Sequence, residues 1–452
     1  MRSIVRSQTP LVVQVNHPFA RELAQISALI DGLPREALEA VHADIVAAGG
    51  DPDKGREGMS ADQVVRATIV KQMTTSSYDE LAFHLQDSWT YQAFCRVAMG
   101  ESIAKSTLQK NIKCVRPETW ERINRLLVKK AQQSGIEVGK KTRTDCTVVE
   151  TNIHEPSDSS LLWDCVRVLC RLMTKAKESF GISFCSRRRR AKRRAMGILN
   201  AKSMAQRVPL YRDLLKVTQE TKGQASEVVA RLREVECGGV HRALVAMAIE
   251  KEIEQVLELT SLVVRQTERR VLQGEAVAAT EKIVSIFEPH TDIIIKDRRD
   301  THYGHKVCLT TGASGMILDM VVEDGNPADS TLASRMITRV KGLFGQAPRQ
   351  AAFDGGFSSK ANVPDIREIG VQDVVFSKHV GLEISDMARS EWVFKKLRNF
   401  RAGIEAGISW IKRVFGLTRC TWKGETAFKS YVWASTVAFN LLVFARRLLP
   451  SS

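Results

Sequence analysis

The spacing of apolar residues changes repeatedly along this 452-residue chain, and the changes restrict the folds that it can adopt. From about Leu33 to Gln133, apolar residues recur with a helical period. Residues 142–153, TRTDCTVVETNI, have the β-branched density of a strand, residues 157–281 are again helical, and strand patterns begin at Ile293. This order predicts an α/β fold with a mixed sheet, a large helical insertion after the first strand and an all-helical N-terminal domain.

The C-terminal part of the chain supplies the other elements of the predicted sheet. DIIIKD, HKVCLTT and MILDMVVED are predicted strands, and the last two form a hairpin around residues 312–315. A helix over about 330–343, a strand ending at Asp354, a strand VQDVVFS and a further helix follow. In such a layer, Asp145, Asp354 and Glu405 are expected to meet at one edge.

The further helix, predicted from Arg398 to Gly416, has an apolar face with a charged border. At about 100° per residue, Arg398, Arg401, Glu405 and Lys412 fall within an arc of roughly 60°. A single carboxylate among cations is consistent with a functional site. The alternative is an ordinary amphipathic helix with an exposed ion pair between Arg401 and Glu405 at i,i+4.

Asp354 stands at the end of an apolar strand and is followed by Gly355 and Gly356. Glycines at such a position let the backbone turn sharply and let a bulky substrate approach. Three carboxylates from separate elements are the ligands expected for Mg²⁺ or Mn²⁺, and two such ions about 4 Å apart promote in-line phosphoryl displacement. Spacing leaves other acids as alternatives: Glu150, Asp158 and Asp164 for the first position, Asp319 and Asp324 for the second, and Glu391 for the third.

Short helices with clear start signals are predicted in the N-terminal part of the chain. Capping boxes begin at Ser60, Ser77 and Ser106. Successive short helices are compatible with a helix-turn-helix module, whose recognition helix would be the segment from Ser106 with Lys110 and Lys113. A plain helical bundle used for packing or dimerisation is the alternative.

The net charge of +16 and a pI near 9.5 indicate a polyanionic partner, either nucleic acid or an anionic membrane surface. Residues 187–194, RRRRAKRR, place seven cations in eight positions. Such a run is either a solvated helix face or a contact to phosphates, and in a chain this basic we favour the phosphate contact. The cations are Arg187, Arg188, Arg189, Arg190, Lys192, Arg193 and Arg194.

Neither export nor membrane insertion is predicted. The N-terminus lacks the apolar run of a signal peptide, and the most apolar tract, Tyr431 to Ala445, is shorter than the roughly 20 residues that span a bilayer. We therefore predict that this tract is a buried helix. Nine cysteines without a C-x-x-C pair suggest no zinc site or disulfide framework, so a reducing cytoplasm is expected.

Four motifs, taken in order, resemble the DDE transposases of bacterial insertion sequences whose third carboxylate lies in a Tyr-Arg-Glu-Lys signature. They are DCTVVETNI, HKVCLTTGASGMILDMVVEDGNPADS, AAFDGGFSS and the R-x3-E-x6-K pattern of Arg401, Glu405 and Lys412. The resemblance covers about residues 142–449. The upstream segments YDELAFHLQDS and STLQKNI are similar to the helical region that precedes the catalytic domain in many such transposases. At the tyrosine position of the signature this chain has Arg398, which changes a contact to the DNA end.

This resemblance implies an RNase H-like catalytic domain over residues 139–452, with a helical insertion at about 157–283. Residues 1–138 would form a helical domain for DNA binding or assembly. Asp145, Asp354 and Glu405 would be the catalytic ligands of two Mg²⁺ or Mn²⁺ ions, and the cations Arg398, Arg401 and Lys412 would lie against DNA.

The implied function is that of a transposase, which binds the ends of an insertion sequence, cleaves DNA and joins the 3′-hydroxyl to target DNA. Its expected partners are double-stranded DNA of the element ends and of the target, and a second copy in a homodimer or larger assembly on DNA, in a bacterial cytoplasm at the nucleoid. An RNase H-like nuclease without strand transfer is one alternative. A domesticated DNA-binding protein without catalysis is another, although the three acids argue against it.

Overall fold

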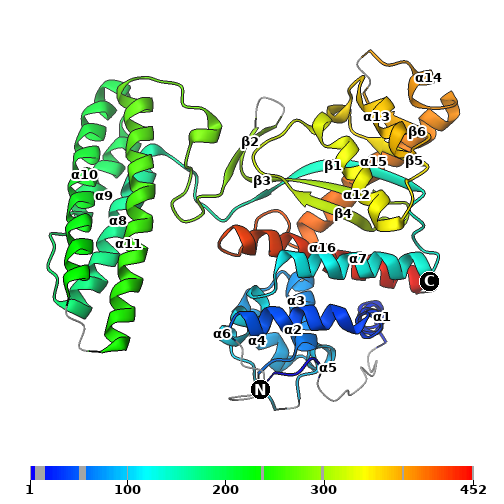
Figure 1. Ribbon diagram of the computed structural model, residues 1–452, viewed down its shortest axis with the longest axis horizontal. Helices are drawn as coiled ribbons and strands as arrows, with labels where there is room; N and C mark the ends of the chain where they lie inside the picture. The colour runs from blue at the N-terminus through cyan, green and yellow to red at the C-terminus, as the bar shows by residue number, and fades with distance from the viewer. Residues whose placement is uncertain are drawn as a thin grey trace. The chain divides into compact units, whose positions relative to one another are not determined.

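The chain forms two compact units (Figure 1). The first joins Met1–Asn152 to Gly304–Ser452, and the second is Ile153–Tyr303. The N-terminal helices thus share a compact unit with most of the sheet, and the domain boundary at residue 138 stays a prediction. The computed structural model describes residues 2–5, 16–49, 58–98, 100–235, 239–296, 300–378 and 381–449.

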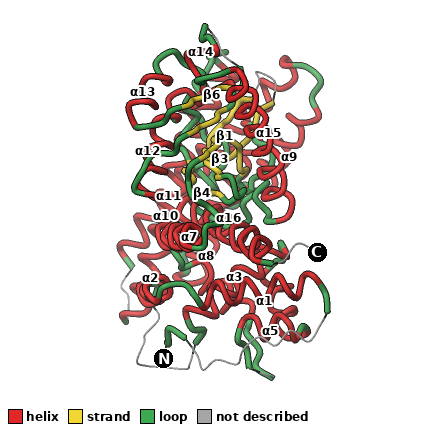
Figure 2. The backbone as a smooth tube through the Cα atoms, turned by 90° about the vertical axis from the view of Figure 1, so that its right-hand side faces the viewer, coloured by secondary structure: helices red, strands yellow, loops and turns green. Residues whose placement is uncertain are grey.

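The strands form a mixed sheet of six, yellow in Figure 2. Of the predicted site acids, Asp145 lies in this sheet and Asp354 directly follows one of its strands. Its strands are β1 (Lys141–Glu150), β2 (Asp292–Lys296), β3 (Asp300–Gly312), β4 (Ile317–Val322), β5 (Gln350–Phe353) and β6 (Asp373–Phe376). The order is β2-β3-β1-β5-β6, with β4 beside β3. β1 is antiparallel to β3 and parallel to β5, which is parallel to β6. Of the segment predicted for β2, Asp297 lies outside the described residues.

The predicted hairpin is confirmed, since β3 and β4 pair antiparallel. The predicted fold class is also confirmed: the chain is mixed α/β, with a mixed sheet and a helical N-terminal region, consistent with an RNase H-like fold.

Seven helices precede the sheet in the described residues of the N-terminal region. Two predicted capping boxes are confirmed, because Ser60 with Gln63 and Ser77 with Glu80 exchange the expected side-chain and backbone hydrogen bonds. The box at Ser106 is wrong: the helix begins one residue earlier, after an extended Ala104 that makes no side-chain cap. The helices are α1 (Pro18–Asp31), α2 (Arg35–Ala47), α3 (Ala61–Thr74), α4 (Tyr78–Asp87), α5 (Trp89–Cys95), α6 (Lys105–Lys113) and α7 (Pro117–Gln133).

The second unit consists mainly of long helices, as predicted. They are α8 (Asp158–Phe180), α9 (Arg188–Asn200), α10 (Met204–Glu234) and α11 (Val240–Thr267), followed by a π-helical turn, η1 (Glu268–Leu272), and a 3₁₀ turn, η2 (Ala279–Glu281). The Ser157 side chain caps α8, and Gly181 ends it with a left-handed φ of 72°. The apolar faces of α8, α10 and α11 pack into a separate hydrophobic core.

The remaining helices belong to the first unit. They are η3 (Asp329–Thr331), α12 (Ala333–Phe344), η4 (Gly355–Phe357), α13 (Asn362–Ile369), α14 (Ile384–Met387), α15 (Glu391–Val414) and α16 (Glu425–Leu448). α15 covers most of the predicted helix, but it ends at Val414 rather than Gly416 and begins at Glu391 rather than Arg398. The Ser390 side chain accepts a hydrogen bond from the Val393 N–H and caps the helix there. The sequence did not predict α13 and α14.

α16 is long and apolar enough to span a membrane by composition, yet 89% of its 18-residue apolar window is buried inside the structure. It lies beside α7 (Figure 1) and also packs against α1, α3 and β4. The prediction of a buried C-terminal helix is confirmed.

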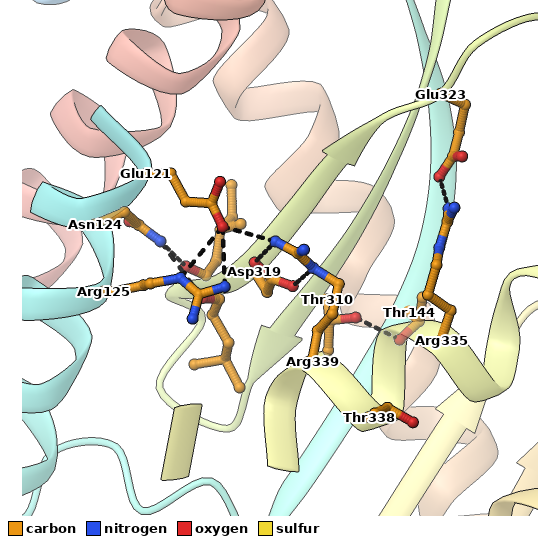
Figure 3. Close-up of polar contacts among 12 residues, drawn as sticks. Glu121, Asn124, Arg125, Thr144, Thr310, Asp319, Glu323, Arg335, Thr338 and Arg339 are labelled. Carbon is orange, nitrogen blue, oxygen red and sulfur yellow. Dashed lines mark hydrogen bonds and ion pairs between the residues drawn. The ribbon is translucent and has the colours of Figure 1, made fainter. Parts of the chain in front are cut away.

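Two polar contacts fasten α7 to the sheet. The fully buried Asn440 on α16 accepts from the Ile317 N–H of β4 at 2.8 Å and donates to the Ile317 carbonyl and to Asn124 of α7, each at 2.7 Å. Figure 3 shows the second contact, in which Arg339 bridges Asp319 of β4 and Glu121 of α7. The N-terminal helices are therefore joined to the sheet by buried hydrogen bonds as well as by apolar packing.

The Asn440 amide predicts a large stability effect. Asn440→Leu keeps the side-chain size but leaves the Ile317 N–H and the side-chain oxygen of Asn124 without their bonds to residue 440. The free energy of unfolding should therefore fall by about 3 kcal/mol. Ser435→Ala is the control on the same helix, because this buried hydroxyl bonds only to the Tyr431 carbonyl one turn earlier, and its cost should stay below about 1 kcal/mol. Urea unfolding of both variants measures the difference, and equal losses would contradict the assigned role.

Candidate active site

Asp145 lies within β1 and Asp354 directly follows β5, at the same level of these two neighbouring parallel strands. The last pair between β1 and β5 is Thr144 with Phe353, and each aspartate is the next residue of its strand's chain. Asp145 is still held in β1 by its antiparallel partner Leu309, whereas β5 ends before Asp354. The strand register therefore places the two carboxylates side by side.

The third acid comes from α15, which packs against β1, β5 and β6. Ile404 and Ile411 are fully buried on the core side of this helix, whereas Glu405 is 64% exposed at its side chain. Helical spacing puts Arg401 one turn before Glu405. Both charged side chains thus lie on the border of the buried face, where the sequence placed them.

A single guanidinium contacts all three acids. The Arg401 Nη2 atom lies 3.1 Å from Asp145 Oδ2 and 2.9 Å from Asp354 Oδ1, and the Nη1 atom lies 2.8 Å from Glu405 Oε1. Arg401 and Asp145 are each only 14% exposed at their side chains. The Arg401–Glu405 pair is therefore not isolated but part of a four-residue cluster.

Two further hydrogen bonds orient the aspartates. The Ser377 hydroxyl, just after β6, donates to Asp354 Oδ1 at 2.9 Å, and the Cys146 backbone N–H donates to Asp145 Oδ1 at 2.7 Å. Each carboxylate therefore has a donor from the sheet as well as the contact to Arg401.

Arg143, which sequence reasoning missed, fastens α15 to β1. Its guanidinium donates to the Phe400 carbonyl at 2.7 Å and to the Thr311 hydroxyl at 2.9 Å, and it covers the Phe400 ring at 4.6 Å. Burial lowers the pKa of this guanidinium from its ordinary value. The signal available in the sequence was its place two residues before Asp145, which puts both side chains on one face of the strand.

The glycines after Asp354 lie in the turn η4, and the approach of a substrate there stays a prediction. Neither has a positive φ, so no left-handed turn requires them. A Cβ on Gly355 would lie 2.8 Å from the Cβ of Lys378, and one on Gly356 would lie 2.8 Å from Asp329 Oδ2. The glycines therefore make room for the protein's own side chains beside the site.

The competing acids are held elsewhere, each by its own cation. Of the candidate acids, Asp145, Asp354 and Glu405 are the three that contact one guanidinium, that of Arg401. The other pairs are Glu150 with Arg419, Asp158 with Arg270, Asp164 with His154 and Arg167, Asp319 with Arg339 (Figure 3), Asp324 with Lys429, and Glu391 with Lys395.

The cluster has the donor atoms of a magnesium site but not yet its spacing. Carboxylate oxygens are the ligands that Mg²⁺ and Mn²⁺ prefer, at about 2.1 Å for Mg²⁺. Within the residues that the structure describes, no three His, Cys, Asp or Glu side chains are arranged as a metal-binding group. Here the Arg401 guanidinium lies among the carboxylates, so the oxygens would have to close around an ion in its place.

Residues 286–441 match the family model of the transposase DDE domain. This segment is a transposase DDE domain. The match confirms the resemblance that the motifs indicated; it includes Asp354, Arg401 and Glu405, while Asp145 precedes it. No curated protein and no solved structure matches the chain. DDE transposases act on DNA and generally use divalent metal ions.

The other cations predicted on α15 of this DDE domain lie on either side of the cluster. Arg398 is exposed and forms no ion pair with the described residues. Lys412 is half-buried, about 10 Å beyond Glu405 at 1.5 Å per residue. In the N-terminal region, Lys110 is exposed on α6, whereas Lys113 is half-buried with its ammonium 6.0 Å from the Tyr78 ring centre.

The basic run of residues 187–194 divides into two stripes on α9 and its N-cap. Arg187 pairs with Glu220 of α10, and Arg190 and Arg194 both pair with Asp213, whose pKa they hold below its usual value. The second stripe is exposed and forms no ion pair within the described part of the chain. It consists of Arg188, Arg189, Lys192 and Arg193.

The close approach of Arg143 to α15 yields a stability prediction. A Cβ on Gly403 would lie 2.2 Å from Arg143 Nη1, so Gly403→Ala must displace the guanidinium from the Phe400 carbonyl. In the wild type this loss should cancel the gain of about 1 kcal/mol that alanine brings to a helix, whereas in an Arg143→Ala background the gain should appear in full.

The control for this cycle is Gly407→Ala on the same helix, where an added Cβ meets nothing within 4 Å. It should stabilise by about 1 kcal/mol in both backgrounds. Urea unfolding of the six proteins gives the coupling, and an equal gain from Gly403→Ala in both backgrounds would rule out the contact.

Proposed function

We propose that this transposase binds the ends of an insertion sequence, cleaves DNA there and joins the freed 3′-hydroxyl to target DNA. The observation that supports this most directly is the convergence of Asp145, Asp354 and Glu405 on one guanidinium beside the adjacent parallel strands β1 and β5. Two of these acids lie within the matched DDE domain. Within the described residues, the alternative acids pair with cations other than Arg401.

In this proposal Asp145, Asp354 and Glu405 hold two divalent ions, Mg²⁺ or Mn²⁺. When bound, such ions supply Lewis-acid stabilisation of the attacking and leaving oxygens in phosphoryl transfer. The sheet fixes the first two carboxylates through β1, β5 and their hydrogen bonds to Cys146 and Ser377. The helix fixes the third, because its buried face anchors α15 against the strands.

The cations along α15 are proposed to bind DNA phosphates. Arg398, Arg401 and Lys412 lie on both sides of Glu405 along one helix border, so a strand following this border would be held in register with the carboxylates. Lys110 and Lys113 on α6 are proposed to contribute to end recognition by the N-terminal helices. Two copies acting together on DNA would bring two element ends to one target.

The cleavage chemistry can be tested at Asp354. Asp354→Asn keeps the hydrogen bond from Ser377 and the shape of the site but removes a charge needed by a divalent ion, so Mg²⁺-dependent plasmid cleavage should fall by about 100-fold or more while DNA binding persists. Glu391→Gln is the control, since Glu391 is an exposed acid on α15 paired only with its own helix neighbour Lys395, and its activity should be unchanged.

Products of the same assay separate the proposed function from its alternative. Joined products between element ends and a second plasmid support transposition, whereas cleavage without joining would support an RNase H-like nuclease. Normal cleavage by Asp354→Asn would remove this residue from the site.

The exposed stripe of α9 is proposed to follow a DNA backbone. Replacing Arg188, Arg189, Lys192 and Arg193 with Gln should lower the slope of log affinity against log salt by about 0.9 for each lost phosphate contact. The control replaces Arg190 and Arg194, which face Asp213, with Gln. It should leave the slope of log affinity against log salt nearly unchanged. If the first variant keeps the wild-type slope, the stripe is a solvated face.

A further inference from the structure

Arg401 occupies the place where the proposed metal ions must bind. One nitrogen of its guanidinium lies about 3 Å from oxygens of both Asp145 and Asp354, and its other terminal nitrogen contacts Glu405. Three carboxylates this close repel one another in a partly buried setting unless a cation is present. In the protein without metal, Arg401 supplies that cation.

An ion and the guanidinium cannot share these positions. Nitrogen-to-oxygen distances of 2.9 and 3.1 Å are hydrogen-bonding distances, whereas Mg²⁺ binds carboxylate oxygens at about 2.1 Å and carries twice the charge. Each oxygen that turns to an ion loses its contact to Arg401. Metal entry therefore requires the arginine side chain to leave the cluster.

The two arginines at this junction are held in different ways. Arg143 is tied to a backbone carbonyl and a hydroxyl, so it has no reason to move when an ion arrives. The ion-pair partners of Arg401 among the described residues are the three carboxylates alone, and its buried Nε has no hydrogen-bond partner there. Of these two arginines, Arg401 is the one whose carboxylate partners would be taken by a metal ion.

We infer that Arg401 is a displaceable counter-cation, which holds the three carboxylates together without metal and is released to a DNA phosphate when divalent ions bind. The inference rests on the proposed metal site. Its consequence is that metal binding and DNA binding favour each other, since a phosphate gives the displaced guanidinium a new anion. Arg401 is thus a positioning residue for the carboxylates as well as a proposed DNA contact.

The test is Mn²⁺ binding to the full chain, measured by calorimetry and by the electron paramagnetic resonance of free Mn²⁺, with no cleavage readout. Arg401→Met removes the competing cation and keeps an aliphatic chain, so Mn²⁺ should bind about tenfold more tightly than to the wild type. Arg398→Met is the matched control: it removes an equal charge one turn earlier on α15, from an exposed side chain without an ion pair, and should change the affinity by less than about twofold.

A second arm measures the coupling. Adding a short DNA duplex should raise the Mn²⁺ affinity of the wild type by several-fold and that of Arg401→Met by much less, because the variant has no guanidinium to transfer. The Mn²⁺ affinity of Arg401→Lys should lie between those of the wild type and Arg401→Met. A lysine ammonium has a single nitrogen, whereas the guanidinium contacts the three carboxylates through two. This variant also keeps the test valid if Arg401→Met fails to fold.

The results distinguish the inference from the proposed function. If Asp145→Asn and Asp354→Asn leave Mn²⁺ binding unchanged, the metal site itself is wrong. If these variants lose Mn²⁺ but Arg401→Met binds it no more tightly than the wild type, or more weakly, the metal site stands and the counter-cation role is overturned.

Discussion

The parallel pairing of β1 with β5 is the constraint on which the candidate site depends. Because the two strands stop pairing at Thr144 and Phe353, the next residues emerge as neighbours whatever rotamers they adopt. A shift of one residue in either strand would turn its aspartate to the opposite face. The antiparallel pairing of β1 with β3 fixes this register from the other side, and the buried contacts of α7 and α16 hold the edge strand β4 against β3.

A site of three acids must also be stable before any ion reaches it. In this chain the same helix provides the third acid and the cation that contacts all three acids, because Arg401 and Glu405 are one turn apart. The Arg143 contact then sets how closely that helix approaches β1, and Gly403 is small enough to permit it. The charge balance of the cluster and the packing of α15 are thus parts of one arrangement.

Local patterns in the sequence were sufficient for the strand carrying Asp145, the strand end at Asp354 and the helix face carrying Glu405. They were not sufficient to reject the competing acids, because ion pairs such as Asp319–Arg339 join residues far apart in the sequence. The same limit explains why Arg143 and the close neighbours of Gly355 and Gly356 were missed: these contacts are known only once the strands are assembled. The predicted start of a helix was wrong where the pattern was ambiguous, as at Ser106, because a serine fits the N-cap and the first turn equally well.

Helical periodicity also resolves the basic run, whose seven cations have two different surroundings. Arg187, Arg190 and Arg194 recur at helical spacing and face acids of α10, whereas the cations between them face solvent and repel one another. Phosphates bound to the exposed stripe would relieve that repulsion and release the counterions condensed on DNA. Arg401 differs from these exposed cations. On binding a phosphate, the cations of the stripe would give up water, whereas Arg401 would give up its carboxylate partners. DNA binding at α9 should therefore carry most of the salt dependence, while the contact at Arg401 should depend chiefly on whether divalent ions have taken its carboxylates.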